Sequence, residues 1–194
     1  MKKLLFIISL FICDYAQAGI YINNNIKPYI GINFGFNILD YTINTELDNK
    51  YTSATINAGT RIGNNFGAEL FFSHSAKNSI QYITDLDTLD HEIYYQSFGF
   101  DLFGYYKISK EFDFFTTFGV ANYKILNKFD YTSIIQNQTE KTTDNTVSTR
   151  IGLGLMYTFF NDDASVLFKY QYTPINNDLI RNMSEFSIGV RYIF

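Results

Sequence analysis

The stretch SEFSIGVRYIF, residues 184–194, decides the fold class. Its bulky apolar residues occupy every second position: Phe186, Ile188, Val190, Tyr192 and Phe194. Alternation of such residues with mostly small, polar or charged ones predicts a β-strand with one apolar face. Chain ends are usually polar and poorly ordered. An aromatic residue that completes the alternation therefore indicates that this strand is held inside a sheet.

The same two-residue period recurs in seven other segments of the chain. They are residues 30–38, 52–62, 66–76, 94–106, 112–122, 151–159 and 166–172. No segment of comparable length shows helical spacing of its apolar residues. We therefore predict an all-β fold of eight antiparallel strands in up-and-down order.

The connections between these segments alternate between long and short. They run over residues 40–51, 63–65, 77–93, 107–111, 123–146, 161–164 and 173–183. Transmembrane β-barrels of the bacterial outer membrane combine short periplasmic turns with long extracellular loops in this way. Lipid cannot satisfy open backbone groups, so we expect the last strand to pair with the first and close the barrel.

Charged residues lie on only one face of the eight predicted strands. That face carries Arg61, Glu69, Asp101, Asp113, Arg150, Lys169, Glu185 and Arg191. The apolar face suits lipid, because a basic residue at the bilayer midplane costs about 2–4 kcal/mol. We expect the charges to pair inside the barrel, with Arg61 and Glu69 as neighbours across the turn 63–65. The alternative is a soluble barrel with its charges outside, because alternation alone fits both topologies.

The first 18 residues have the three parts of a secretory signal peptide. They are a basic start, an apolar stretch from Leu4 to Cys13 and an A-x-A site at Ala16 and Ala18. The apolar stretch is too short to span a membrane as a helix. We expect cleavage after Ala18, which leaves a mature barrel domain of residues 19–194. Cys13 is the single cysteine, so the mature chain would have no disulfide and no thiol chemistry.

The composition narrows the classes of partner. The chain has 19 Asp and Glu against 15 Lys and Arg and a formal net charge of −4, which argues against binding of nucleic acid. Its 194 residues are the length of one domain. The interior of an eight-stranded barrel is just filled by side chains. We therefore expect a monomer without a wide pore.

Four segments carry a family resemblance over essentially the whole mature chain. PYIGINFGF (28–36), FGAELFFSHS (66–75), FGVANY (118–123) and SIGVRYIF (187–194) resemble porin-family outer-membrane β-barrels, a group that includes the OmpA transmembrane domain, OmpX and the opacity proteins. The resemblance implies a multi-pass protein in outer-membrane lipid with four extracellular loops. It also implies a signal for the barrel assembly machinery, formed by Ile188, Val190, Tyr192 and Phe194. No peptidoglycan-binding domain follows Phe194, so we do not expect an anchoring role.

The two histidines are the candidates for chemistry. An acyl enzyme that modifies lipid A would need His74, a serine such as Ser75 and an acid such as Asp85 to converge. Alternation instead places His74 and Ser75 on opposite faces of one strand. His91 lies among acidic residues, but without the ligand spacing of a recognised cation site. We predict no catalytic, metal or cofactor site.

The long loops are the most varied part of the chain, above all residues 123–146. Loops on a rigid scaffold are where binding residues concentrate. We therefore predict a surface-exposed protein that acts in adhesion, in contact with a host or the environment through an extracellular ligand, or in envelope integrity. A small gated porin is the first alternative, and a lipid A-modifying enzyme that uses His74 is the second. Passive shielding of the cell surface by these loops also fits the sequence.

Overall fold

The computed structural model describes residues 26–42, 48–83, 87–133, 137–159 and 163–194. They form nine strands: β1 (Ile26–Tyr41), β2 (Lys50–Ile62), β3 (Phe66–Ser75), β4 (Asn78–Ile83), β5 (Asp87–Lys107), β6 (Phe112–Ser133), β7 (Asn137–Phe159), β8 (Ala164–Thr173) and β9 (Ile180–Ile193). All eight predicted segments lie within or largely within these strands. No helix among the described residues is long and apolar enough to cross a membrane.

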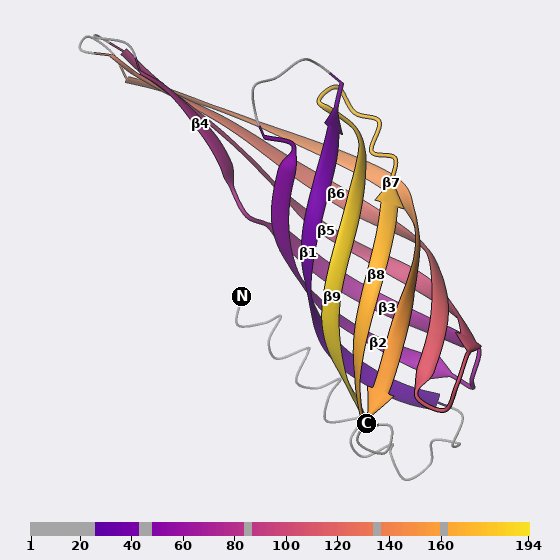
Figure 1. The fold of residues 1–194 in the computed structure, drawn as a ribbon. Helices are drawn as coiled ribbons and strands as arrows, with labels where there is room; N and C mark the ends of the chain where they lie inside the picture. Colours follow the sequence, from indigo (N-terminus) through magenta and orange to yellow (C-terminus); the bar gives the residue numbers. More distant parts are fainter. Residues whose placement is uncertain (1–25, 43–47, 84–86, 134–136, 160–162) are drawn as a thin grey trace, which may run out of the picture.

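The strands close into a barrel (Figure 1). Their order is β3-β2-β1-β9-β8-β7-β6-β5-β4, and a further pairing of β3 with β5 completes the ring. β3 and β4 both pair with β5, β3 along residues 96–104 and β4 along 88–93, so they occupy one position with a break between them. The ring therefore has eight strand positions. The last strand, β9, pairs antiparallel with β1. The predicted fold class and closure are confirmed.

The two faces of the barrel wall divide the side chains as the alternation predicts. Phe34 on β1 is 60% exposed and points outward, whereas the adjacent Asn33 is buried. Outward-facing aliphatic and aromatic residues continue around the ring on every strand of the wall, including Ile56, Leu70, Phe100, Phe118, Leu153, Phe168 and Ile188. A continuous apolar outer surface of this kind is suited to lipid and not to water.

The predicted loops 77–93 and 123–146 are wrong, because most of these residues are strand. β5 pairs with β6 from Asp87 to Lys107, and β6 pairs with β7 up to Thr132 and Asn137. We call β4 together with residues 87–95, 123–133 and 137–147 the projecting sheet. It extends beyond the barrel as a long, narrow sheet (Figure 1). Antiparallel hydrogen bonds satisfy its backbone where loops would have needed other partners.

The barrel interior contains two apolar clusters, one toward each end. The upper cluster, on the side of the projecting sheet, consists of Leu39, Tyr51, Phe71, Ile93, Tyr95, Ala121, Tyr123, Ile125, Ile175, Ile180 and Met183. The lower cluster consists of Phe103, Tyr105, Phe115, Met156 and Leu167. The interior therefore holds large apolar side chains as well as the charges that the sequence places there. Inward glycines make room for these large side chains: a Cβ on Gly154 would lie 2.4 Å from Phe115 Cζ.

The connections between strands differ at the two ends of the barrel. At the lower end Gly63 turns the chain with a φ of 61°, a conformation that glycine adopts without steric cost. At the upper end the β8–β9 connection places Ile175 in the upper cluster. Asn177 Oδ1 accepts hydrogen bonds from the backbone N–H groups of Leu179 (3.1 Å) and Ile180 (2.5 Å). The chain ends at Phe194, at the end opposite the projecting sheet (Figure 1).

Candidate functional site

Two ion pairs stabilise the lower part of the interior. Arg191 Nη2 donates to Glu69 Oε2 at 2.7 Å, and Tyr29 Oη donates to the same oxygen at 3.0 Å. Arg61 Nη1 lies 2.6 Å from Asp113 Oδ2. Arg61 and Glu69 were expected to be neighbours, but each binds a residue on another strand. The turn brings β2 and β3 side by side, yet Glu69 stands opposite Gly59 and Arg61 opposite Gly67, so both side chains extend across the lumen instead.

A second ionic group lies higher, around Asp101. Arg150 Nε is 3.2 Å from Asp101 Oδ1, and Lys169 Nζ is 3.9 Å from Asp101 Oδ2. The Arg150 guanidinium also donates to Gln171 Oε1 and stacks 4.0 Å from the centroid of the Phe71 ring. Glu185, the eighth predicted charge, is buried on the same inner face. All eight predicted interior charges are inward, and two of them, Arg150 and Lys169, meet the carboxylate of a third, Asp101.

The apolar clusters determine whether this interior can conduct water. The charged layer between them contains Asp101, which is fully buried. Above it Tyr95 and Tyr123 lie with their ring centroids 6.2 Å apart. Below it Phe103 and Phe115 lie 5.6 Å apart. A water path through the barrel would have to cross both aromatic layers.

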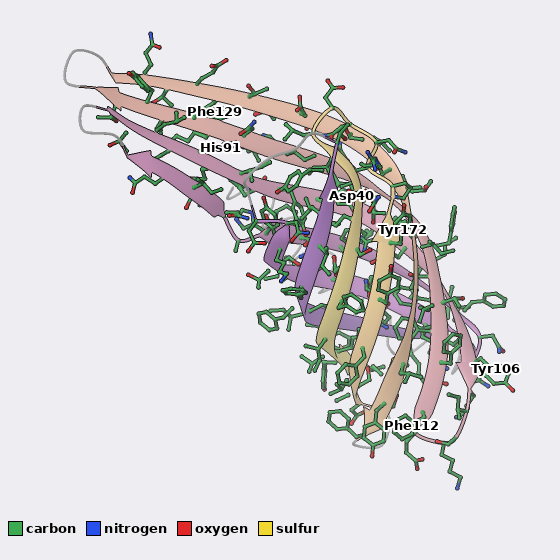
Figure 2. The ribbon with its side chains drawn as sticks, turned by 45° about the horizontal axis from the view of Figure 1, so that its top comes forward. Asp40, His91, Tyr106, Phe112, Phe129 and Tyr172 are labelled. Atoms are coloured by element: carbon green, nitrogen blue, oxygen red, sulfur yellow. The ribbon has the colours of Figure 1, made fainter. Side chains whose placement is uncertain are left out.

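One face of the projecting sheet continues the inner surface of the barrel. It carries apolar and aromatic residues on β4, β5 and β6, whereas β7 adds Gln138, Glu140, Thr142 and Asp144 to it. Register places His91 of β5 opposite Phe129 of β6, and their rings stack at 4.1 Å with an interplanar angle of 15°. His91 Nε2 also hydrogen-bonds Asn127 Oδ1 at 2.7 Å. Ile80, Leu89, Ile93, Ile125 and Tyr131 lie on the same face. Figure 2 shows His91 and Phe129 on the projecting sheet, far from the barrel residues Tyr106 and Phe112. We call this surface the aromatic face.

The opposite face of the projecting sheet is polar and charged. Asp90 and Glu92 of β5 stand opposite Asp130 and Lys128 of β6. Lys128 Nζ hydrogen-bonds Asp130 Oδ2, and Thr139 Oγ1 donates to Asp130 Oδ1 at 2.7 Å. These hydrogen bonds lower the pKa of Asp130 below its usual range, and the bond to Asp130 raises the pKa of Lys128. The two faces of the projecting sheet therefore differ on β5 and β6, where one face is aromatic and apolar and the other is charged.

The described residues do not bring His74 together with a serine, as an acyl enzyme would require. His74 points outward, with its ring 5.9 Å from that of Tyr94, whereas Ser73 and Ser75 are buried on the inner face. Ser75 Oγ accepts a hydrogen bond from the backbone N–H of Tyr95 at 2.9 Å. Asp85 lies outside the described residues. The prediction that alternation separates His74 from the serines agrees with this geometry, and the absence of enzymatic activity stays a prediction.

Cation binding near His91 also lacks a converging set of ligands. His91 is on the aromatic face, whereas the flanking Asp90 and Glu92 are on the charged face. Within the described part of the chain, no group of three or more His, Cys, Asp and Glu residues is placed to hold a metal ion.

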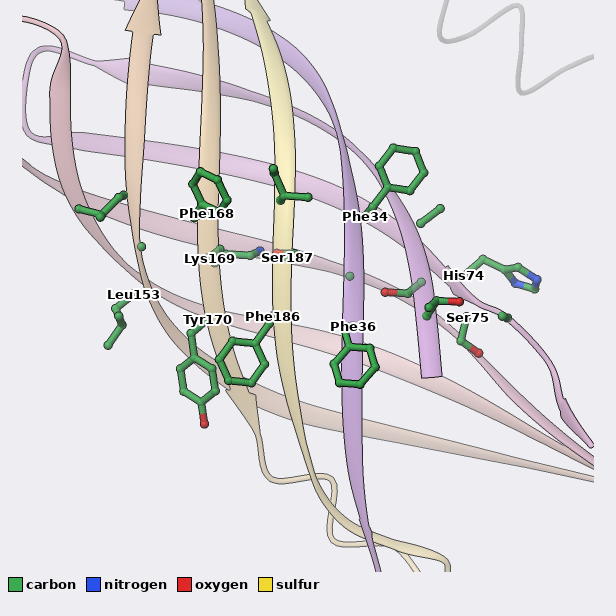
Figure 3. Close-up of a pocket in the computed structure, with 18 of the residues that line it drawn as sticks. Phe34, Phe36, His74, Ser75, Leu153, Phe168, Lys169, Tyr170, Phe186 and Ser187 are labelled. Carbon is green, nitrogen blue, oxygen red and sulfur yellow. The ribbon is translucent and has the colours of Figure 1, made fainter. Parts of the chain in front are cut away.

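The outer surface of the barrel carries a broad apolar depression lined by residues of strands β6, β7, β8, β9, β1, β2 and β3. Figure 3 shows Phe34, Phe36, Phe168 and Phe186 standing away from the strands on the outer side, while Lys169 lies behind them. The depression thus consists of gaps between outward side chains at one level of the barrel. Its position on the lipid-facing belt makes acyl chains its natural occupants.

The predicted assembly signal forms one stripe on β9. Ile188, Val190, Tyr192 and Phe194 are all exposed on the outer face. The rings of Tyr192 and Phe194 are perpendicular at 5.2 Å, and the Phe194 N–H donates to the Pro28 carbonyl at 2.9 Å. Its role in assembly stays a prediction. The predicted cleavage site at Ala16 and Ala18 lies outside the described residues.

The aromatic face was missed because its sequence signal is weak. Leu89, Ile93 and Tyr95 alternate with polar residues, as in a strand, but His91 interrupts the apolar series. On the partner strand β7 both faces are polar, with Thr139, Thr142 and Thr143. Threonine favours strands, so the repeated threonines are the feature of the sequence that indicates a strand here.

Comparison with known proteins agrees with this geometry. The family described as "Outer membrane protein beta-barrel domain" matches residues 16–194. Among curated proteins, none matches the sequence at a significant level.

Several solved structures share the fold. Ail, the attachment invasion locus protein of Yersinia pestis, solved in complex with the heparin analogue sucrose octasulfate, is 16% identical; the match covers 88% of this chain and 99% of that one, with a TM-score of 0.59. Neisserial surface protein A (NspA) is 15% identical over 86% and 97% of the two chains, with a TM-score of 0.59. OprG from Pseudomonas aeruginosa is 13% identical over 87% and 95%, with a TM-score of 0.53. At these identities the likeness is one of fold.

Proposed function

Because this chain belongs to the family of outer membrane protein β-barrel domains, we propose that it is a cell-surface binding protein. In this proposal the barrel anchors the chain in the outer membrane, and the aromatic face of the projecting sheet attaches the cell to a protein partner. The observation that carries the proposal is the stacked pair of His91 and Phe129 on a sheet that extends beyond the lipid-facing belt.

The aromatic face has the composition of a binding surface. Tyr131 is 38% exposed, and His91, Phe129, Leu89 and Ile80 are each partly exposed. An isolated sheet in water gains nothing from presenting such residues on one face, and aromatic residues are enriched where protein surfaces bind partners. The strand pairing holds these side chains in fixed positions, which reduces the entropy lost on binding.

The charge of the projecting sheet favours a protein partner over a sulfated polyanion. The described acidic side chains are Asp90, Glu92, Asp130, Glu140 and Asp144, and the basic ones are Lys124, Lys128 and Lys141. Recognition of sulfate groups relies on clusters of basic residues, and here acidic residues outnumber them. The ligand in the Ail complex is a heparin analogue, so the proposed partner of this chain differs in chemistry from that ligand.

The free edge of β4 offers a second contact to the same partner. Among the described strands β4 pairs only with β5. The pairing runs from Asn78 opposite Ile93 to Ile83 opposite Thr88. Its sequence NSIQYI contains no charged residue, and charge is a common means by which proteins protect an open edge. A partner strand added there would lie beside the aromatic face.

Attachment of whole cells tests the proposal. Cells that display the wild-type chain are compared with cells without it, and with cells that display Phe129→Ala or, as a matched control on the charged face, Lys141→Ala. Surface amounts are equalised by antibody labelling of intact cells. We expect Phe129→Ala to weaken attachment to immobilised host-surface proteins at least about tenfold, as for an aromatic residue central to an interface, and Lys141→Ala to leave it unchanged.

Two results would overturn the proposal. One is attachment by the wild-type cells no stronger than that of cells without the protein. The other is equal attachment by Phe129→Ala and wild-type cells at equal surface amounts.

A further inference from the structure

A small hollow opens at the lower end of the barrel, on the side opposite the projecting sheet. Its volume is about 80 Å³, and five basic side chains line it together with one carboxylate, Asp113. The basic residues are Lys27, Arg61, Lys107, Lys110 and Arg191. This volume exceeds the roughly 10–15 Å³ that a single water needs. An excess of positive charge in a confined space attracts anions.

Two buried donors in the lining have no hydrogen-bond acceptor. Ser165 Oγ is fully buried and lacks a partner, and so does Nε of Arg191, whose side chain is 2% exposed. Register places Ser165 on β8 directly opposite Arg191 on β9, and both face the hollow. A buried polar group without a partner destabilises the fold. An acceptor placed in the hollow would relieve that destabilisation at both atoms.

The carboxylates that bind the two arginines of the lining leave one guanidinium N–H without an acceptor. Asp113 Oδ2 is 2.6 Å from Arg61, and Glu69 binds the Nη2 of Arg191 at 2.7 Å, which leaves the Nε of Arg191 for another acceptor. Glu111 lies in the adjacent turn, where Ser109 Oγ donates to it at 3.4 Å. Lys107 and Lys110 are exposed on the rim. The site therefore combines buried donors with exposed cations at its entrance.

The carboxylate of Asp113 restricts which anion fits the hollow. Its second oxygen, Oδ1, is buried and has no hydrogen-bond donor. A ligand that fits must offer acceptor oxygens to Ser165 and Arg191 and one hydrogen-bond donor to Asp113. A phosphate that retains one proton has both, whereas sulfate near neutral pH has acceptors only.

We propose that this hollow is a binding site for a phosphate group at the periplasmic mouth of the barrel. The group enters between Lys107 and Lys110, accepts hydrogen bonds from Ser165 Oγ–H and Arg191 Nε–H, and donates one to Asp113. Two sources can supply these groups: free inorganic phosphate, whose remaining proton is the donor, and the headgroup of an inner-leaflet phospholipid, in which a hydroxyl or ammonium group beside the phosphodiester is the donor. Outward aromatic residues at the same end, such as Phe66 and Tyr192, mark a membrane interface where headgroups lie.

The experiment uses the full chain refolded in a phosphate-free glucoside detergent. In one arm inorganic phosphate is titrated by calorimetry, with sulfate as the matched anion. In the other arm a short-chain phosphatidylglycerol is added, and bound lipid is counted by native mass spectrometry against a glycolipid of equal chain length. The variants are Ser165→Ala and the pair Lys107→Ala with Lys110→Ala, and Lys124→Ala on the projecting sheet is the matched control. A change in gel migration between unheated and heated samples shows that each variant is folded.

We expect the wild type and Lys124→Ala to bind phosphate or the phospholipid at least about tenfold more tightly than sulfate or the glycolipid. We expect the double lysine variant and Ser165→Ala each to weaken binding about tenfold or more. Binding of phosphate identifies the free anion as a sufficient ligand, and binding of the phospholipid alone identifies the headgroup. No preference over sulfate and glycolipid in either arm, or binding that the folded variants leave unchanged, would overturn the proposal.

Discussion

Arg191 on β9 and Glu69 on β3 are 122 residues apart in sequence, yet Arg191 Nη2 lies 2.7 Å from Glu69 Oε2 in the barrel interior. The side chains are 2% and 1% exposed. The guanidinium also stacks 4.4 Å from the centroid of the Tyr29 ring, and Tyr29 donates to the same carboxylate oxygen. The pair therefore connects two strands that do not neighbour each other in the ring.

Replacing one member of this pair should destabilise the barrel strongly. Arg191→Met leaves Glu69 charged and buried without its partner, and breaking a buried pair costs about 3–5 kcal/mol. We expect this loss in the free energy of unfolding, measured by urea titration in detergent micelles. Arg181→Met is the matched control, because the Arg181–Asp40 pair at 3.5 Å is largely exposed and exposed pairs contribute about 0–1 kcal/mol. Equal losses for the two variants would contradict the assignment of Arg191 as an interior anchor.

Gly154 should be intolerant of even one added carbon. A Cβ at this position would lie 2.2 Å from the Phe168 carbonyl oxygen and 2.4 Å from Phe115 Cζ. We expect Gly154→Ala to lower the free energy of unfolding by about 1–3 kcal/mol, as for overpacking of a filled core. At Gly104 the nearest atom to an added Cβ is Thr116 Oγ1 at 3.4 Å, so Gly104→Ala should be neutral or slightly stabilising. A neutral Gly154→Ala would show that the lower cluster has room to shift.

The alternation of residues gave a correct account of the barrel wall but not of contacts across the lumen. Period two assigns Phe34 to the outside and Arg191 to the inside whatever the register between strands. The partner of an inward charge depends on the tilt and stagger of the closed barrel, which no local pattern contains. Arg61 therefore binds Asp113 on β6 and not Glu69 on the neighbouring strand β3. The projecting sheet was missed for a related reason, since Thr139 and Thr142 on its β7 strand are polar on both faces and give no apolar period.

The interior should not conduct ions. The Tyr95 and Tyr123 rings lie within the upper cluster and the Phe103 and Phe115 rings within the lower one. We expect purified wild-type protein to leave planar bilayers silent in single-channel recordings, with a known porin inserted as the positive control. Regular steps of conductance from the wild type would contradict this expectation and support the gated-porin alternative.

Phe194 should matter for assembly in cells and little for the folded barrel. It is 66% exposed and its ring contacts only the edge of Tyr192 among the described ring pairs. We expect Phe194→Ser to lower the amount of heat-modifiable barrel in the outer membrane severalfold, while refolding of the purified chain into detergent changes little. Phe66→Ser, which removes an equally exposed outward aromatic residue at the same end, is the control and should assemble normally. Equal defects for both variants would show that the defect comes from losing an outward aromatic residue that contacts lipid, and not from losing a terminal signal.

Strong acid should loosen the projecting sheet around Asp130. Hydrogen bonds from Lys128 and Thr139 lower the pKa of Asp130, so the folded sheet favours the ionised carboxylate. This contribution is fully present above the unfolded pKa of about 3.9 and is lost as the pH falls through the lowered pKa of the folded state. We expect hydrogen exchange of the backbone amides of residues 128–142, corrected for the intrinsic pH dependence, to accelerate in that range. In Asp130→Asn, which lacks the titrating group, the same amides should show no such transition; an identical transition there would assign the effect to other carboxylates.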